Sequence, residues 1–172
     1  MDSIEILPDP HAEELIRRDW ARLQDSDLPS QARHTAASNR PHITLLAAPA
    51  VPDHFDPALQ GLNETLPIGA HTAGLMVFRT GRGLVLARAV VVGVALLELH
   101  RKVHQALADV PKIAENSVPG RWIPHLTLAR GLSPDQLARA VEILPPDHGS
   151  ITLAGLRRWD SHQRTTTALA SR

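Results

Sequence analysis

The stretch Pro41-His42-Ile43-Thr44-Leu45 recurs later in the chain as Pro124-His125-Leu126-Thr127-Leu128. Given one such pentapeptide, this composition would supply a second match on the order of one time in a thousand, by multiplying residue frequencies. The copies lie about half a chain length apart, and each falls in a strand-like run, residues 41–48 and 123–130. The repetition therefore predicts two similar lobes, with residues 41–45 and 124–128 supplying one motif strand to each.

Each motif carries two kinds of side chain in alternation. Because successive side chains of a strand point to opposite faces, the histidine and threonine of a copy share one face and its apolar residues the other. The apolar face suits a core and the polar face suits a cleft. If the two strands meet across a pseudo-twofold axis, two imidazoles and two hydroxyls converge on a volume that suits a phosphate.

Strands and helices alternate along the rest of the chain. Proline at the first helical position follows a capping residue at Asp9-Pro10 and at Ser133-Pro134, and Gln136 completes a capping box with Ser133. Strands are expected at 3–7, 41–48, 70–78, 84–92, 123–130, 150–159 and 164–170, and helices at about 10–24, 56–61, 93–108 and 134–144. No linker divides these elements, so the pattern predicts a single domain over residues 1–172, of mixed α/β or α+β class.

Composition excludes several classes of function. The 172 residues include 18 basic and 18 acidic ones, and this zero net charge argues against a protein that coats long stretches of duplex nucleic acid. The chain has no cysteine, hence no thiolate nucleophile or cysteine-ligated zinc. His100 and His104 have the spacing of a zinc half-site but lack an intervening glutamate and a third ligand, so we expect no metal.

The chain has no feature of a membrane or secreted protein. Its longest apolar run, residues 89–97, is far shorter than the roughly 20 residues of a membrane helix. Its acidic first residues lack the basic-then-apolar order of a signal peptide. We therefore expect a cytoplasmic, monomeric protein that binds no membrane and needs no obligate protein partner.

The paired histidines indicate acid–base chemistry. Histidine has an unperturbed pKa of ~6.5, so near neutral pH one ring can act as a base while the other acts as an acid. Threonine hydroxyls can donate hydrogen bonds to the non-bridging oxygens of a phosphate in its transition state. This scheme uses neither a metal nor a cofactor.

These motifs resemble those of the two-histidine (2H) phosphoesterase superfamily, in the branch of RNA 2',3'-cyclic phosphodiesterases also called the 2'-5' RNA ligase family. The likeness extends to the flanks of the second motif, residues 122–130, and to the 78–86 hairpin. It implies a bilobal fold in which antiparallel-rich sheets line a central cleft and helices pack outside. It also implies roles: His42 as proton donor, His125 as proton acceptor, and Thr44 and Thr127 as phosphate contacts.

The sequence indicates the substrate less closely than it indicates the chemistry. Arg121 and Arg130 flank the second motif, and with Phe78 of the hairpin they are the candidate substrate-binding residues. Larger members of the family continue the first motif into Phe-Leu-Gly, whereas this chain reads Leu46-Ala47-Ala48. The chain has no tyrosine and few other aromatic residues, so platforms for stacking bases are scarce.

The leading hypothesis is metal-independent hydrolysis of a 2',3'-cyclic phosphodiester to a 2'-phosphomonoester, on an RNA 3' end or a small cyclic nucleotide. Two alternatives stay open. One is a non-catalytic module that binds an RNA end or a nucleotide phosphate. The other is a sibling phosphodiesterase acting on ADP-ribose cyclic phosphate or on 2'-5' linkages, because the motifs address the phosphate and not the sugar or base. ATP-dependent ligation is not expected, since neither Lys102 nor Lys112 lies in a recognisable nucleophile setting.

Overall fold

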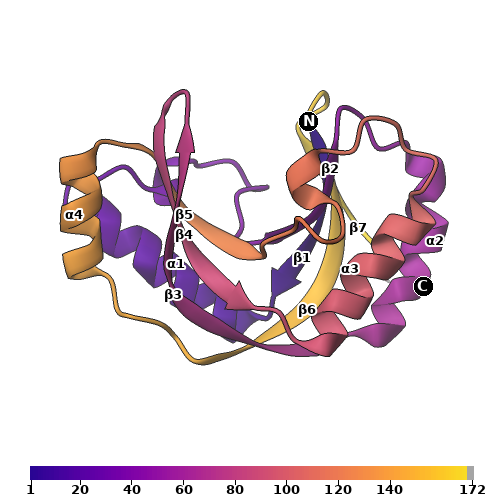
Figure 1. The fold of residues 1–172 in the computed structure, drawn as a ribbon, viewed down its shortest axis with the longest axis horizontal. Helices are drawn as coiled ribbons and strands as arrows, with labels where there is room; N and C mark the ends of the chain where they lie inside the picture. Colours follow the sequence, from indigo (N-terminus) through magenta and orange to yellow (C-terminus); the bar gives the residue numbers. More distant parts are fainter. Residues whose placement is uncertain (170–172) are drawn as a thin grey trace.

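One antiparallel sheet carries both motif strands, at opposite ends of its strand order. The computed structural model describes residues 1–169, in which the order is β2-β1-β6-β3-β4-β5, with β7 pairing with β6 (Figure 1). The strands are β1 (Asp2–Pro8), β2 (Ile43–Ala48), β3 (Ile68–Thr80), β4 (Gly83–Val91), β5 (His125–Leu132), β6 (Ser150–Asp160) and β7 (Thr165–Ala168). The helices are α1 (Pro10–Asp25), α2 (Asp56–Gln60), α3 (Val94–Ala106) and α4 (Pro134–Ile143), with 3-10 turns η1 (Gln31–Arg33), η2 (Asp53–Phe55), η3 (Gly61–Thr65) and η4 (Glu115–Ser117).

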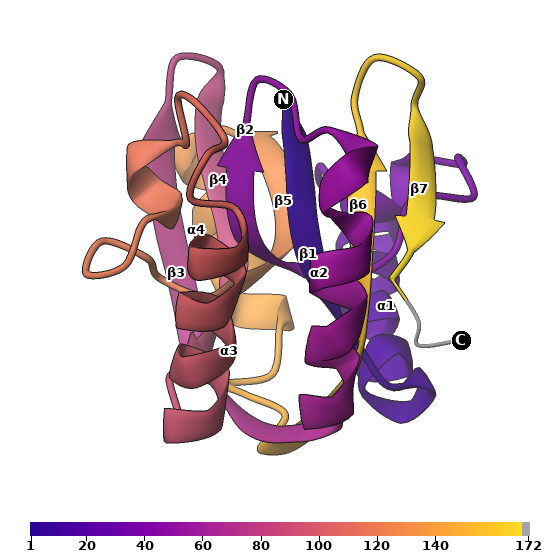
Figure 2. The ribbon, with the colours of Figure 1, turned by 90° about the vertical axis from the view of Figure 1, so that its right-hand side faces the viewer.

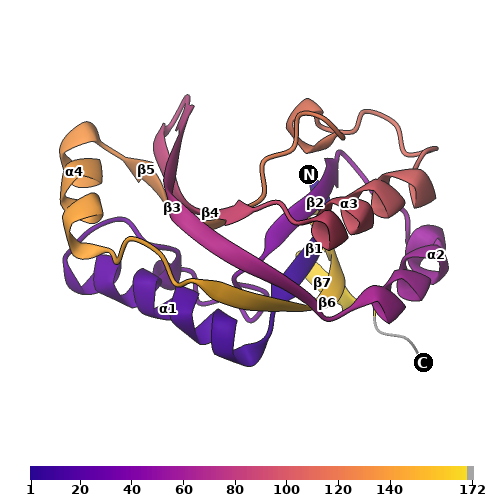
Figure 3. The ribbon, with the colours of Figure 1, turned by 60° about the horizontal axis from the view of Figure 1, so that its bottom comes forward.

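The sheet bends at β3, and the bend brings its two ends together. The first residues of β3, Ile68–His71, pair with β6, and the strand from His71 to Thr80 pairs with β4. Figure 3 shows β3 as one long strand that joins the two arms of the sheet. Although β2 and β5 share no ladder, they come into contact with each other. The motif strands therefore meet by curvature of the sheet rather than by pairing.

Helices cover the outside of the bent sheet, and two of them, α1 and α3, pack against the motif strand that is distant in the sequence. Figure 1 shows α1 and α4 outside one arm and α2 and α3 outside the other, and Figure 2 shows α2 and α3 from that second side. The helix α1, from the N-terminal half of the chain, packs on β5, and α3, which follows β4, packs on β2. None of the helices among residues 1–169 is long and apolar enough to cross a membrane.

Both motif strands contain a β-bulge at the last residue of the motif. The β1–β2 register passes from Leu46 to Thr44 and skips Leu45. The β4–β5 register passes from Ala129 to Thr127 and skips Leu128. A bulge inserts one residue and bends the strand, so two consecutive residues can face the core. All four of these apolar residues are fully buried, and the duplication thus extends from the sequence to the strand geometry.

The mixed α+β prediction with an antiparallel sheet is confirmed. Both helix caps are also as predicted: the Asp9 side chain accepts from Ala12 N at 2.7 Å, and Ser133 forms its capping box. Some bounds differ. β2 and β5 begin after Pro41 and Pro124 because proline has no N–H for the ladder, and β3 exceeds 70–78 because its first residues find a partner in β6. The expected strand 164–170 is β7, and residue 170 lies outside the described residues.

Candidate active site

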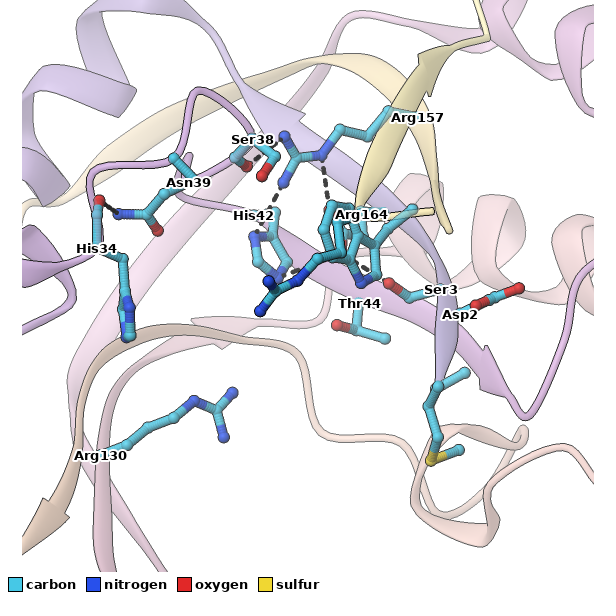
Figure 4. A pocket seen from close by; sticks show the side chains of 15 residues that line it. Asp2, Ser3, His34, Ser38, Asn39, His42, Thr44, Arg130, Arg157 and Arg164 are labelled. Carbon is cyan, nitrogen blue, oxygen red and sulfur yellow. Dashed lines mark hydrogen bonds and ion pairs between the residues drawn. The ribbon is translucent and has the colours of Figure 1, made fainter. Parts of the chain in front are cut away.

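The polar faces of the motifs line three adjoining cavities. One of about 620 Å³ is lined by His42 and Thr44, one of about 440 Å³ by His125 and Thr44, and one of about 60 Å³ by His42 and Thr127. Arg130 lines all three. Figure 4 shows the largest cavity, with Arg130 reaching into it from the side opposite His42. The structure therefore places both histidines and both threonines of the motifs in the walls of three cavities that share lining residues.

The two motif imidazoles are anchored in the same way. Nδ1 of His42 lies 2.8 Å from the carbonyl oxygen of Arg40, and Nδ1 of His125 lies 2.8 Å from that of Ile123. Because a carbonyl only accepts, each Nδ1 carries the proton and donates it. Arg157 Nη2, at 3.4 Å from His42 Nδ1, then has no lone pair to bind there. In each neutral ring Nε2 is the nitrogen left for chemistry.

The charges around the two imidazoles differ. Burial lowers the pKa of His125, and the positive charges of Arg130 and His42 lower it further, against the opposing hydrogen bond to Ile123. These effects favour the neutral form of the His125 ring. Nε2 of His42 lies 3.5 Å from Oε1 of Glu5, an ion pair when the ring is protonated. The two rings share an anchor but face different charges.

A tryptophan holds the backbone of each motif threonine. The Trp122 indole donates to the Thr44 carbonyl at 2.8 Å, and the Trp20 indole donates to the Thr127 carbonyl at 3.0 Å. The Trp122 ring is stacked on that of His100, with centroids 4.0 Å apart and planes 6° apart. These bonds join each motif strand to a distant segment and fix the position of its threonine.

His100 and His104 use ring nitrogens to hold the backbone. His100 Nε2 lies 2.8 Å from the Ser117 carbonyl oxygen, and His104 Nε2 lies 3.2 Å from that of Leu45. Burial lowers the pKa of both. Their contacts are therefore those of packing groups behind β2. Within residues 1–169 no group of three or more His, Cys, Asp or Glu side chains is placed to hold a metal ion.

The predicted substrate-binding residues are not all placed together. Arg130 lines all three cavities, and Phe78 lines the one beside His125, its ring centroid 4.7 Å from that of the histidine. Arg121 is exposed, pairs with Glu115 at 2.7 Å and is not among the residues that line these cavities. Arg130 and Phe78 thus lie beside the motifs, whereas Arg121 lies apart.

Sequence reasoning missed several residues on the His42 side. Those lining the largest cavity include Ser3, Glu5, Arg157, Trp159 and Arg164. One signal for two of them was present, because polar Ser3 and Glu5 alternate with apolar Ile4 and Ile6 in the first strand. Such alternation marks a strand with one polar face, although only the fold shows what that face borders.

Comparison with known proteins shows the family to which the chain belongs. The model of the 2'-5' RNA ligase superfamily matches residues 7–166. The chain belongs to this superfamily. Its membership confirms the resemblance carried by the motifs and, at the level of the family, implies cyclic phosphodiesterase-type activity. A comparison with curated protein sequences gave no match.

Solved structures show the same fold as this superfamily member. TT0787 of Thermus thermophilus is 17% identical with a TM-score of 0.62, over 98% of this chain and 94% of that one. Escherichia coli LigT complexed with 3'-AMP is 23% identical with a TM-score of 0.59, over 97% and 92%. LigT complexed with NADP+ is 17% identical with a TM-score of 0.53, over 97% and 91%. At these identities the likeness concerns the fold.

Proposed function

We propose that this protein hydrolyses a 2',3'-cyclic phosphodiester, on an RNA 3' end or a small cyclic nucleotide, to a 2'-phosphomonoester without a metal ion. One observation carries the proposal. Both motif imidazoles are anchored through Nδ1 and line adjoining cavities that share Thr44 and Arg130. Two free Nε2 atoms beside hydroxyl donors and an arginine are what acid–base cleavage of a phosphodiester requires.

The proposed architecture is bilobal, within the single domain of residues 1–172. The halves that carry residues 41–45 and 124–128 form two pseudo-twofold lobes, with the cleft between them. The exchanged packing of α1 on β5 and of α3 on β2 supports this arrangement. The bulge at the same motif position of each strand also supports it.

In the proposed mechanism His125 is the base and His42 the acid. Neutral Nε2 of His125 takes a proton from water as the water oxygen attacks phosphorus. The bond from phosphorus to O3' breaks, and O3' takes a proton from Nε2 of His42. Thr44 and Thr127 donate hydrogen bonds to the non-bridging oxygens, and Arg130 offsets their charge. The product has a 2'-phosphate and a 3'-hydroxyl, and proton exchange with solvent restores both rings.

A nucleotide substrate fits the space beside the motifs. Phe78 lines the cavity next to His125, and Trp159 lines the cavity next to His42, so each cavity offers an aromatic surface for a base. LigT has been solved with 3'-AMP and with NADP+, which supports a nucleotide ligand for a chain of this fold. The RNA end and the small cyclic nucleotide remain the two forms of the proposed substrate.

The proposal is tested with 2',3'-cyclic nucleotides and with an RNA ending in a 2',3'-cyclic phosphate, in the presence and absence of EDTA. We expect turnover that EDTA does not reduce. His42→Ala and His125→Ala should each lose roughly 10²–10⁴-fold in kcat, while His11→Ala, on the exposed surface of α1, should match the wild type. Undiminished activity after either motif change would contradict the mechanism.

The same assay separates the alternatives. Saturable binding of these ligands without turnover would favour the binding module. Faster turnover of ADP-ribose cyclic phosphate or of a 2'-5' linked dinucleotide would favour a sibling specificity and retain the mechanism.

A further inference from the structure

A buried carboxylate lies beside the acid histidine. Glu5 of β1 is 4% exposed and lines the largest cavity. A negative charge there opposes the binding of an anionic phosphate. Phosphate binding therefore does not explain why the Glu5 carboxylate lies in the wall of this cavity.

Two donors hold the Glu5 carboxylate. Oε2 accepts from Arg157 Nε at 2.6 Å, and Oε1 accepts from Ser3 Oγ at 2.7 Å. Such charge-assisted bonds favour the ionised carboxylate and fix its orientation. Glu5 is thus a negative charge of defined position in the wall of the cavity.

The distance from Glu5 to His42 suits an electrostatic effect and not a hydrogen bond. Oε1 lies 3.5 Å from His42 Nε2, beyond the roughly 2.7–3.2 Å of an N–H···O hydrogen bond. The carboxylate therefore favours a positive imidazolium without engaging its Nε2 proton. That proton remains available to a leaving oxygen.

Among residues 1–169 no carboxylate forms an ion pair with His125 of the second motif. Glu5 is the register partner of Thr44 on β1, and the residue in register with Thr127 on β4 is Ala87. Next to the motif threonine, the neighbouring strand thus carries a carboxylate at the first motif and a methyl group at the second. This difference falls at the same motif position in both strands.

We infer that Glu5 is a positioning residue that assigns the acid role to His42 and leaves the base role to His125. The inference rests on the proposed function. It holds that two imidazoles with the same backbone anchor take different roles because a carboxylate lies beside His42, whereas burial and the charge of Arg130 favour the neutral form of His125.

Other charged groups also face His42. They are the Met1 amino group and Asp2 at the start of β1, Arg157 from β6, Arg164 from the β6–β7 turn, Arg130 and His125 from β5, and His34 from the loop before β2. Arg157 opposes a positive ring, and its pairing with Glu5 offsets that effect. Removing the Glu5 charge should therefore leave His42 facing net positive charge.

The first test is the pH profile of kcat/KM for a 2',3'-cyclic nucleotide. In the proposed mechanism the acid limb reports loss of the neutral base and the alkaline limb reports loss of the protonated acid. Glu5→Gln keeps the shape and removes the charge. We expect its alkaline limb to move down by about one pH unit, a roughly tenfold loss on that limb, while the acid limb stays in place. Glu14→Gln, in an exposed pair on α1, is the matched control with no shift.

Arg157→Gln should move the alkaline limb of the pH profile in the opposite direction. Without the guanidinium, Glu5 acts on His42 unopposed, so the alkaline limb should move up. Two shifts in opposite directions are not the result of general damage to the site. Unmoved alkaline limbs in active Glu5→Gln and Arg157→Gln variants would overturn the inference.

Titration of the free protein separates this inference from the proposed function. Histidine ring signals followed by NMR need no substrate, and His42→Ala and His125→Ala assign them. Glu5→Gln should lower the midpoint of His42 and leave that of His125 unchanged. If this shift appears in a protein that turns over no cyclic phosphate, the proposed function fails while the charge effect stands. If the protein is active and the His42 midpoint does not move, the inference fails alone.

Discussion

The two motif strands are alike where they face the cavities and different behind. At both motifs, a histidine Nδ1 donates to the carbonyl two residues before it, a bulge follows the threonine, and an indole donates to the threonine carbonyl. The supporting layers share no such pattern. The geometry of the motif histidines and threonines is therefore repeated, while the charges around them and the residues that support them differ between the two strands.

The support behind β5 is ionic and that behind β2 is aromatic. On α1, Asp19 is fully buried and pairs with the fully buried Arg88 of β4 at 2.7 Å. On α3, the fully buried His100 stacks on Trp122. One motif strand thus depends on compensated charges and the other on neutral rings, so the two should fail under different conditions.

The largest expected effect comes from breaking the ionic support. Asp19 Oδ2 lies 2.7 Å from Arg88 Nη2 and 2.7 Å from His148 Nε2. Asp19→Asn leaves the Arg88 charge buried and uncompensated, which should lower the free energy of unfolding by about 3–5 kcal/mol. Urea denaturation measures the loss.

The control for this change is Asp25→Asn, at the exposed end of the same helix. It should stay within about 0.5 kcal/mol of the wild type. Equal effects of the two substitutions would mean that the buried pair contributes nothing particular to β5.

The aromatic support should respond to pH instead. Burial lowers the pKa of His100, and its Nδ1 is buried without a hydrogen-bond partner in the described residues. As pH falls below the unfolded pKa of ~6.5, the unfolded chain binds a proton that the folded His100 resists, so the free energy of unfolding decreases. Each such group contributes at most about 1.4 kcal/mol per pH unit.

His100→Phe tests this contribution, because it keeps an aromatic ring against Trp122 and removes the titrating group. Between pH 7 and pH 5 the variant should lose less stability than the wild type in urea denaturation. His104 and His125, whose pKa values burial also lowers, leave a residual slope. Parallel curves for variant and wild type would show that His100 takes no part in the pH dependence.

Local sequence patterns were sufficient to predict the main helices and strands and which motif residues face the core. The period-two alternation predicts that Ile43 and Leu126 face the core, and both are fully buried. The capping box at Ser133 depends on residues within one helical turn and forms as predicted. Features that depend on neighbours in the sequence could be predicted because their physical causes are local.

Features that depend on pairing between distant strands could not be predicted from the sequence. Glu5 reaches the first motif only because β1 pairs with β2, and the alternation in β1 does not indicate which strand lies beside it. The position of β2 and β5 at opposite ends of one bent sheet likewise follows from β3 pairing with both β6 and β4. A register between distant strands is set by the whole fold, and one sequence does not display it.

The smallest expected effect tests whether the two motif strands are also alike in the stability that their indole hydrogen bonds contribute. Trp20 comes from a helix and Trp122 from a loop, yet each indole donates to the carbonyl of a motif threonine. Trp20→Phe and Trp122→Phe keep a packed ring and remove only the donor, so each should cost about 1 kcal/mol of stability. Because the bonds are equivalent, the two losses should agree within about 0.5 kcal/mol. If Trp122→Phe cost several times more than Trp20→Phe, its stack on His100 would outweigh the indole bond, and the likeness of the strands would stop at their histidines and bulges.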